Sequence, residues 1–427
     1  MSLKETLKKI PGLRPLVKGV KSLVCDLGAM PNFLAERKLP RDNGPIRVGI
    51  FCQYLPSWHK MRQIYENMRA DDRFAPYLIC LPSGVQDGKL TNPDCTENDT
   101  YEYFLSHGYP EALNALQPDG SWLDLKALNL TYIFYPRPYD NYMPEPYQSR
   151  NVSRYSKICV VLYCINTTEE IVKTTVNRVF FRYVYCFFSE IPYSRDINRK
   201  NGWLLHSLKL QQSVYYGLPG IEDVRSAAQL PRPAWDFSKN DFRVLWCPRW
   251  TTDLTLGGSN FFTFYKFLLD LAEKDPTTDF LFRPHPLALR HFQETGEMTA
   301  EEAEAFVARC DALPNVQLDK QPDYAATFWG TSVMICDISG IIPEYFITGN
   351  PLIYCSANMH LTLEETTAKI LEGSYIVEDA AQLEACLEQL RRGEDPLKEK
   401  RQQIIRELFG EDMSHPAEKI TEHLAKH

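Results

Sequence analysis

The order of short apolar runs and helical segments in residues 231–427 constrains this chain more than any other feature of its sequence. The runs are bounded by turn residues and are suited to buried parallel strands, and the segments between them fit amphipathic helices. The predicted strands cover residues 242–247, 279–283, 316–318, 332–336 and 351–354. The predicted helices cover residues 261–273, about 299–309 and 323–330, and a further helix begins at 342. This alternation favours a doubly wound α/β domain.

Residues 45–230 repeat the pattern less regularly. Strand-like runs occur at residues 47–54, 77–81, 130–135, 157–163 and 183–189, and a helical stretch lies near 59–70. Proline and glycine punctuate the sequence within 31–45 and again at 219–233, which indicates a linker and a domain boundary. We therefore predict an arm and linker at 1–44, one Rossmann-like domain at 45–230 and a second at 231–427.

Two doubly wound domains of this kind are predicted to face each other across a cleft. Ligands of open α/β sheets bind outside the carboxyl ends of the strands, so the cleft is the expected binding region. The last stretch, about 396–425, has a helical pattern and is expected to pack back across the cleft.

The first 24 residues differ from the rest because they are basic and amphipathic. They carry Lys4, Lys8, Lys9, Arg14, Lys18 and Lys21 against Glu5. Apolar residues recur among them at a spacing of three to four, which fits a helix face. Pro11-Gly12 and Pro15 predict that the helix is broken into two short pieces. The segment is predicted to dock on an anionic membrane surface, where each cation contributes on the order of 1 kcal/mol. The alternative is a helix packed on the body with its charges in water.

Composition excludes several classes of protein. A net charge of -8 disfavours nucleic-acid binding. Twelve scattered cysteines without a CxxC pair indicate reduced thiols in a cytosolic protein. The sequence contains no apolar run of transmembrane length and no clear secretory signal. No GxGxxG follows residues 47–54, which disfavours a dinucleotide dehydrogenase. The sequence also contains no GxxxxGK[ST] loop, which disfavours a P-loop enzyme, and no HExxH motif, which disfavours a zinc site.

Three polar clusters follow three predicted strands of the second half. They are Cys247-Pro248-Arg249-Trp250-Thr251, Arg283-Pro284-His285-Pro286, and Asp337-Ile338-Ser339-Gly340 leading into Pro343-Glu344-Tyr345. Because parallel strands end at one edge of a sheet, we expect the clusters to converge. Arg249, Arg283 and His285 are expected to present cations, and the Ser339-Gly340 turn is expected to present backbone N–H groups. Together these groups predict a pyrophosphate site.

Each of these residues also has a structural interpretation. Arg249 fits a surface cation, Trp250 a core aromatic, and His285 a loop residue. Asp337 fits the N-cap of a short helix. Glu344, one turn into the helix that begins at 342, is expected to accept hydrogen bonds from a ribose diol.

The first half offers weaker candidates at the ends of its own strands. His59, in Pro56-Ser57-Trp58-His59, is expected to overhang the cleft, where its pKa suits deprotonation of an acceptor hydroxyl. A loop histidine without a catalytic role is the alternative. The segments Tyr135-Pro136-Arg137-Pro138-Tyr139 and Phe188-Ser189-Glu190 are candidates for contacts with an acceptor.

The second half resembles the CDP-glycerol glycerophosphotransferase family of teichoic acid and capsule polymer synthesis. The resemblance rests on Pro248-Arg249-Trp250-Thr251, on RPHP at 283–286 and on CDISGIIPEYFITGNPLIYC at 336–355, and covers about residues 210–360. The family typically has Pro-Thr-Trp-Arg, a later His-Pro and an Asp-Tyr-Ser-Ser segment. Here the order of Arg249 and Trp250 differs, Ile338 stands for Tyr, and Gly340 stands for the second Ser.

The resemblance implies a GT-B fold in which residues 45–230 bind the acceptor and 231–427 bind a CDP-activated polyol. The residues expected to bind the donor are Arg249, Trp250, Thr251, Arg283, His285, Asp337, Ser339, Gly340 and Glu344. The acceptor hydroxyl is expected to attack the β-phosphorus of CDP-glycerol, with His59 as general base, so that CMP departs. Arg249, Arg283 and His285 are expected to neutralise the leaving phosphate. No cofactor or metal is invoked.

The partners implied are a nucleotide-activated donor, a lipid-linked or glycan acceptor and the inner face of the cell membrane, where the protein is expected to be peripheral. Two other functions stay open at this point. One is a GT-B glycosyltransferase or 2-epimerase that acts on a UDP-sugar. The other is a non-catalytic, membrane-associated module of a polysaccharide assembly, which predicts no nucleotide binding.

Overall fold

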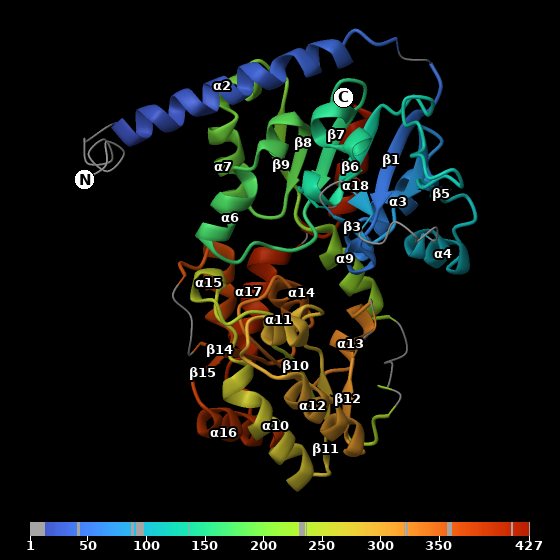
Figure 1. Ribbon diagram of the computed structural model, residues 1–427. Coiled ribbons are helices and arrows are strands. Elements are labelled where there is room, and N and C mark those ends of the chain that lie inside the picture. Colours follow the sequence, from blue (N-terminus) through green and yellow to red (C-terminus); the bar gives the residue numbers. More distant parts are fainter. Residues whose placement is uncertain are drawn as a thin grey trace. The chain divides into compact units, whose positions relative to one another are not determined.

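The computed structural model describes residues 13–40, 43–86, 89–90, 98–135, 137–229, 235, 237–319, 321, 323–356, 361–410 and 413–426. The chain forms two compact units (Figure 1). The first contains Met1–Tyr163, Lys173–Leu218 and Pro416–His427, and the second contains Cys164–Val172 and Pro219–His415. The predicted boundaries, 45–230 and 231–427, differ from this division because each unit takes in a segment that is distant in sequence.

The first unit is built on a seven-stranded parallel sheet in the order β5-β2-β1-β6-β7-β8-β9. The strands are β1 (Ile46–Cys52), β2 (Phe74–Cys80), β5 (Leu113–Asn114), β6 (Tyr132–Tyr135), β7 (Lys157–Val161), β8 (Val184–Ser189) and β9 (Gln212–Tyr215). A small antiparallel pair, β3 (Val85–Gln86) and β4 (Lys89–Leu90), lies outside this sheet. The chain builds outward from β1 in one direction and from β6 in the other. The topological switch point therefore lies between these two strands.

Helices complete the first unit. They are α2 (Leu13–Glu36), α3 (Arg62–Arg69), α4 (Asp99–Ser106), α5 (Ser149–Val152), α7 (Pro192–Asn201), α8 (Trp203–Ser207) and α18 (Pro416–Ala425). Helix α6 (Glu169–Val176) is divided between the units, since its residues up to Val172 belong to the second and those from Lys173 belong to the first. The short 3-10 turns are η1 (Leu55–Lys60), η2 (Asp140–Tyr142), η3 (Glu145–Tyr147) and η4 (Val179–Tyr183).

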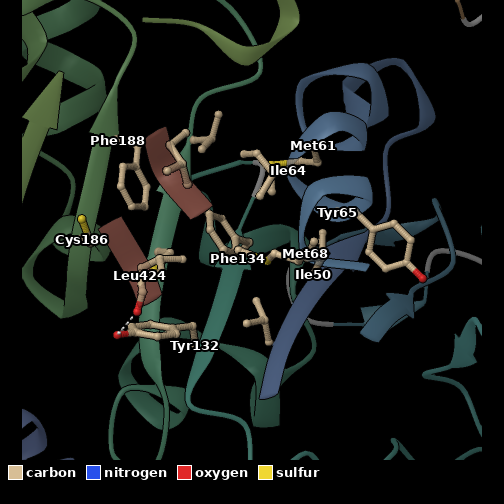
Figure 2. Close-up of a cluster of buried hydrophobic side chains, with 14 of the residues drawn as sticks. Ile50, Met61, Ile64, Tyr65, Met68, Tyr132, Phe134, Cys186, Phe188 and Leu424 are labelled. Carbon is tan, nitrogen blue, oxygen red and sulfur yellow. Dashed lines mark hydrogen bonds between the residues drawn. The ribbon is translucent and has the colours of Figure 1, made fainter. Parts of the chain in front are cut away.

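The C-terminal helix α18 packs into the core of the first unit. Its Ala417, Ile420 and Leu424 are completely buried in the cluster that also holds Ile50 and Phe134. Figure 2 shows Leu424 beside Tyr132, whose hydroxyl donates to the Leu424 carbonyl at 3.4 Å. The helical pattern predicted for about 396–425 is confirmed by α17 (Lys398–Phe409) and α18.

Helix α2 runs without interruption across the described part of the arm. The prediction of a break at Pro15 is wrong, because this proline lies in the first turn of α2, where its missing N–H has no helical partner to lose. The helix also continues through Pro31 into the segment predicted to be a linker. Contacts with the first unit hold it there, including an ion pair of 2.9 Å between Asp26 and Arg182. Residues 1–12, with most of the predicted basic charge, lie outside the described residues.

The second unit is built on a six-stranded parallel sheet in the order β12-β11-β10-β13-β14-β15. The strands are β10 (Phe242–Cys247), β11 (Thr278–Phe282), β12 (Val316–Leu318), β13 (Val333–Cys336), β14 (Leu352–Cys355) and β15 (Tyr375–Val377). The strands predicted at 242–247 and 316–318 match fully, the other three match within one residue, and β15 was missed. The switch point of this sheet lies between β10 and β13.

The helices of the second unit cover a core of aromatic and aliphatic side chains that includes Trp246, Phe261 and Phe282. They are α9 (Pro219–Ala227), α10 (Phe261–Lys274), α11 (Ala288–Glu294), α12 (Ala300–Ala312), α13 (Ala325–Trp329), α14 (Ile342–Phe346), α15 (Glu365–Leu371), α16 (Ala380–Arg391) and α17, with the 3-10 turn η5 (Leu254–Leu256). The prediction of two α/β parts with doubly wound parallel sheets is confirmed. None of the helices in the described residues is both long and apolar enough to cross a bilayer.

Candidate functional site

The three predicted clusters meet at the carboxyl edge of the second sheet. Cys247 at the end of β10 is in register with Cys336 at the end of β13, and Trp246 is in register with Phe282 at the end of β11. The backbone N–H of Arg283 donates to the Trp246 carbonyl at 2.8 Å, and that of His285 donates to the Pro248 carbonyl at 3.3 Å. The segments after β10, β11 and β13 are therefore neighbours at and beside the switch point.

Asp337 is the anchor of this edge. Its buried carboxylate accepts from the backbone N–H of Arg249 at 2.8 Å and from that of Asn260 at 3.2 Å. It also accepts from the Ser259 hydroxyl at 3.1 Å and from Nδ2 of Asn260 at 2.9 Å. Burial raises the pKa of Asp337, and these donors oppose that shift. Asp337 thus ties both ends of the loop 249–260 to β13, which is a structural role rather than the helix N-cap considered above.

Ser259 and Asn260 were not predicted from the sequence. They return the loop to the sheet after two glycines with positive φ, Gly257 at 107° and Gly258 at 60°. Only glycine adopts these backbone angles without strain, so the Gly-Gly pair is the signal that marks a reversal of the loop. Asn260 Nδ2 also donates to the Cys355 carbonyl at 3.0 Å, which ties the loop to β14.

Arg249 is held by its side chain as well as by its backbone. Its Nη1 donates to the Ile338 carbonyl at 2.7 Å, so the guanidinium lies over the segment that follows β13. Trp250 is half-buried and meets the His291 ring edge to face, with 4.7 Å between ring centroids. Thr251 is buried and belongs to the framework of the loop, because its carbonyl accepts from the Ser259 N–H at 2.7 Å.

His285 is exposed, with its ring centroid 6.3 Å from that of Trp250. Its Nδ1 accepts a hydrogen bond from the Leu287 N–H at 3.2 Å, so in the neutral ring the proton lies on Nε2. The surrounding protein, and secondarily the Arg249 charge, lower the pKa of His285 to about 4. The direction of this shift favours the neutral ring, which presents an N–H donor, over the cation that the sequence predicts.

Arg283 and Glu344 are more deeply integrated in the structure than predicted. Arg283 forms an ion pair of 2.5 Å with Asp319, donates to the Gln321 carbonyl at 2.8 Å and lies over the Tyr324 ring. Its charge is thus largely offset. Glu344 is completely buried, and its carboxylate accepts from the Tyr324 hydroxyl. A ribose cannot reach a carboxylate that is fully enclosed, so this structure does not place Glu344 at the predicted contact.

The Ser339-Gly340 turn lies at the end of β13 and is half-buried. The helix after it, α14, has only five residues, which limits the dipole expected at its N-terminus. Gly340 packs closely against another part of the second unit, since a Cβ there would lie 2.5 Å from the Cβ of Cys164. That segment, Cys164–Val172, is bridged to the second unit by an antiparallel pair between Thr168 and Leu363.

His59 belongs to the first unit and is not among the groups that the second sheet brings together. It lies in η1, directly after β1, and only 5% of its surface is exposed. Its neighbour Trp58 packs against the rings of Phe104 and Tyr109. The role of His59 as general base stays a prediction.

Comparisons with known proteins agree with this fold. No protein-family model matches the sequence, and no curated protein is similar to it. Among solved structures, the UDP-GlcNAc 2-epimerase from Neisseria meningitidis bound to UDP-GlcNAc is 12% identical, with a TM-score of 0.58 over 90% of this chain and 100% of that chain. The 2-epimerase from Methanocaldococcus jannaschii is 11% identical, with a TM-score of 0.55 over 90% and 100%.

The wall teichoic acid polymerase TagF is also similar in structure. In a form of that enzyme with CDPG, the identity is 14% and the TM-score is 0.54 over 98% of each chain. At such identities the likeness shows the fold alone, and the predicted GT-B-like class is confirmed. These neighbours are enzymes that act in the chemistry of nucleotide sugars and teichoic acid.

Proposed function

We propose that this chain is a transferase that moves a polyol phosphate, most directly glycerol phosphate, from a CDP-activated donor to a hydroxyl of a cell-surface glycan or lipid-linked acceptor. The observation that carries the proposal is the loop 249–260, which Asp337 fixes beside His285 at the switch point of the second sheet. A fixed arginine and a neutral imidazole N–H suit the two phosphates of a CDP donor. The likeness to the teichoic acid polymerase supports this donor class.

In the proposed reaction the acceptor oxygen forms a bond to the β-phosphorus of the donor. The bond between this phosphorus and the bridging oxygen breaks, and CMP leaves with that oxygen. Arg249 would stabilise the charge that develops on the leaving phosphate, and the Nε2–H of His285 would donate to one of its oxygens. The hydroxyl proton passes to a base, a role we assign to His59.

The first experiment measures CMP release from CDP-glycerol by the purified chain, with membranes as a crude source of acceptor. CDP-ribitol and UDP-GlcNAc are assayed in parallel. The proposal predicts CMP release that depends on acceptor. Turnover of UDP-GlcNAc alone, with no reaction of either CDP-polyol, would contradict it.

A substitution at His285 tests the site itself. His285→Ala should lower turnover roughly 100-fold, because it removes one donor to the leaving phosphate. The matched control is His107→Ala, since His107 is an exposed histidine of the first unit that stacks on Tyr103. Both variants should unfold at the wild-type temperature. Near-normal turnover by His285→Ala would remove this residue from the site.

The second candidate is an enzyme that transfers or epimerises a UDP-sugar. It is favoured by the similarity to 2-epimerases over nine-tenths of the chain. It predicts turnover of UDP-GlcNAc and indifference to CDP-polyols. A non-catalytic module, the third candidate, predicts that neither nucleotide binds.

We also propose that the protein is peripheral on the inner face of the cell membrane, with α2 as part of the docking surface. Val20, Val24, Leu27 and Leu34 are exposed and recur on one face of this helix. Replacing Val20, Val24 and Leu27 by Asn should reduce co-sedimentation with phosphatidylglycerol vesicles. Unchanged co-sedimentation of that variant would exclude α2 from the surface.

A further inference from the structure

The switch point of the first sheet also carries an arginine. Gln53 and Tyr54 directly follow β1, and Arg137 lies two residues after the end of β6, the strand paired with β1. Ligands of open α/β sheets bind in the crevice outside the carboxyl ends at this point of the topology. Arg137 therefore lies at the switch point of the first sheet, as Arg249 does in the second, but it follows the strand on the other side of that point.

Arg137 is held in place by neutral groups. Its Nη2 donates to Oε1 of Gln53 at 2.6 Å, and Nε2 of Gln53 donates to the Tyr142 carbonyl at 2.6 Å. The guanidinium carbon lies 4.6 Å from the ring centroid of Tyr142 and 5.1 Å from that of Tyr54. Two aromatic faces and one amide thus fix the position of the cation before any ligand arrives.

The charge of Arg137 has no counter-ion in the described part of the chain. Burial lowers the pKa of Arg137, and the phenols of Tyr142, Tyr163, Tyr54 and Tyr139 oppose that shift. By contrast, the buried Arg182 of the same unit is paired with Asp26 at 2.9 Å. A half-buried cation without a carboxylate is costly, and an anion that enters from solvent relieves that cost.

Donors toward such an anion are available. Gln53 accepts from one N–H of the Arg137 guanidinium, and no acceptor for the other N–H groups lies among the described residues. None of the Arg137 nitrogens is both buried and without a hydrogen bond. The hydroxyls of Tyr139 and Tyr142 likewise have no hydrogen-bond partner in the described part of the chain. The rings of these two tyrosines meet edge to face at 5.9 Å. We call Tyr54, Tyr139 and Tyr142 the tyrosine cage.

A second cation extends the positive charge of this region. The guanidinium of Arg178 lies 4.5 Å from the ring centroid of Tyr139, and the residue is exposed. The acid in this loop, Asp140, does not compete for either arginine. Its carboxylate accepts from the Ser149 N–H at 2.6 Å and from the Ser149 hydroxyl at 2.8 Å. Two arginines around one tyrosine favour a doubly charged anion.

We propose that Arg137 and the tyrosine cage bind a phosphate group of the acceptor. This inference rests on the proposed function, because only a transferase has an acceptor. It narrows that acceptor to a molecule with a phosphomonoester or phosphodiester near its reacting hydroxyl. Arg137 would grip two phosphate oxygens through its free edge, and the hydroxyls of Tyr139 and Tyr142 would donate to the others. Arg178 would add long-range attraction.

The test measures binding of sn-glycerol 3-phosphate to the full chain by isothermal titration, with CDP present to occupy the donor site. Arg137→Gln should weaken binding at least roughly tenfold, because it removes a charge-assisted pair of hydrogen bonds. Arg137→Lys keeps the charge without the planar fork and should give an intermediate loss. Glycerate, with a single negative charge, should bind more weakly than sn-glycerol 3-phosphate.

The matched control is Arg73→Gln. Arg73 belongs to the same unit, but it precedes β2 at the opposite end of the sheet and is paired with Asp71 and Glu422. This variant should bind sn-glycerol 3-phosphate as the wild type does. Equal binding by wild type and Arg137→Gln would overturn the proposal, and equal affinity for glycerate would overturn the assignment to phosphate.

The outcome is separable from that of the proposed function. If the wild type releases no CMP from CDP-glycerol, the transferase proposal fails, whereas loss of sn-glycerol 3-phosphate binding in Arg137→Gln would still support the phosphate site. If CMP is released, Arg137→Gln should raise KM for the acceptor at least tenfold and leave binding of CDP-glycerol unchanged.

Discussion

The two parallel sheets each place an arginine at their switch point, but they hold it in different ways. In the second unit the buried carboxylate of Asp337 binds the backbone of Arg249 and the far end of its loop. In the first unit Arg137 is held by the amide of Gln53 and by aromatic rings. One arginine is organised by an ionisable group, and the other is organised by neutral groups.

This difference has consequences for binding. The buried carboxylate of Asp337 accepts four hydrogen bonds and so ties both ends of the loop, at the cost of removing a charge from water, as the raised pKa of Asp337 indicates. Neutral groups fix Arg137 without cancelling its charge. Under the two proposals above, the second unit would give geometric precision at the donor, and the first would attract an anion.

Removal of the anchor should give the largest effect. Asp337→Ala leaves buried donors of Arg249, Ser259 and Asn260 without their acceptor, which should lower the free energy of unfolding by about 3 kcal/mol. Release of the loop should weaken CDP-glycerol binding roughly 100-fold. Urea denaturation and equilibrium binding measure the two effects.

The counterpart in the first unit is Gln53→Ala, which removes one neutral acceptor of Arg137 and should cost about 1 kcal/mol. Asp337→Asn keeps one acceptor oxygen and should fall between the two. If Asp337→Ala is no more destabilising than Gln53→Ala, the contrast between an ionic and a neutral anchor is wrong.

The parts of the site that the sequence predicts are those set by local pattern and topology. Arg249, Arg283 and Ser339 follow recognisable strands, and parallel strands end at one edge, so their proximity follows from the order of the elements. The partners of these residues are different in kind. Asp319 bonds Arg283, and Asn260 bonds Asp337, through loops whose spacing has no characteristic period.

Contacts between distant segments also set the limits of the two units. Nothing in residues 164–172 distinguishes them from the first half, yet they pack against Gly340 and Leu363 of the second unit. Helix α18 joins the first core because its buried face fits α3 and the sheet, whereas its amphipathic pattern would suit any apolar surface. Packing likewise carries α2 through Pro31, which propensity alone would treat as a break.

The close approach at Gly340 gives a second comparison between the units. In Gly340→Ala the new Cβ would lie 2.5 Å from the Cβ of Cys164 and 3.1 Å from the Ile165 carbonyl oxygen, neither of which moves without its backbone. This substitution should destabilise the chain by about 2 kcal/mol. In Gly49→Ala the Cβ meets the ends of Leu130 and Ile79, which can rotate, so a loss of about 1 kcal/mol is expected. Thermal unfolding of both variants decides the order, and a larger loss for Gly49→Ala would contradict the view that Gly340 is rigidly enclosed.

The ion pair of Arg283 allows the charge of the second switch point to be changed directly. Asp319→Asn removes the carboxylate that offsets Arg283 and should lower stability by about 1 kcal/mol, because the pair is only partly exposed. The same change makes the second unit resemble the first, with an uncompensated arginine. CDP-glycerol should therefore bind more tightly at low ionic strength and lose that gain as salt is added. Unchanged affinity at low salt would show that Arg283 lies outside the reach of the donor.

The smallest effect concerns the protonation of His285. Proton NMR of its ring should give a titration midpoint near 4, below the ordinary histidine value of about 6.5. Replacing Arg249 by Met should raise that midpoint, because it removes the second cause of the shift.

The lowered pKa of His285 also makes stability depend on pH. Between pH 4 and 6.5 the folded state binds fewer protons at His285 than the unfolded state does. The contribution of His285 to the free energy of unfolding is therefore complete above pH 6.5. It is lost as the pH falls toward 4. His285→Asn should therefore show a shallower decline of stability from pH 6.5 to 5 than the wild type. A midpoint near 6.5 would restore His285 as a cation near neutral pH and bring the second switch point closer to the first.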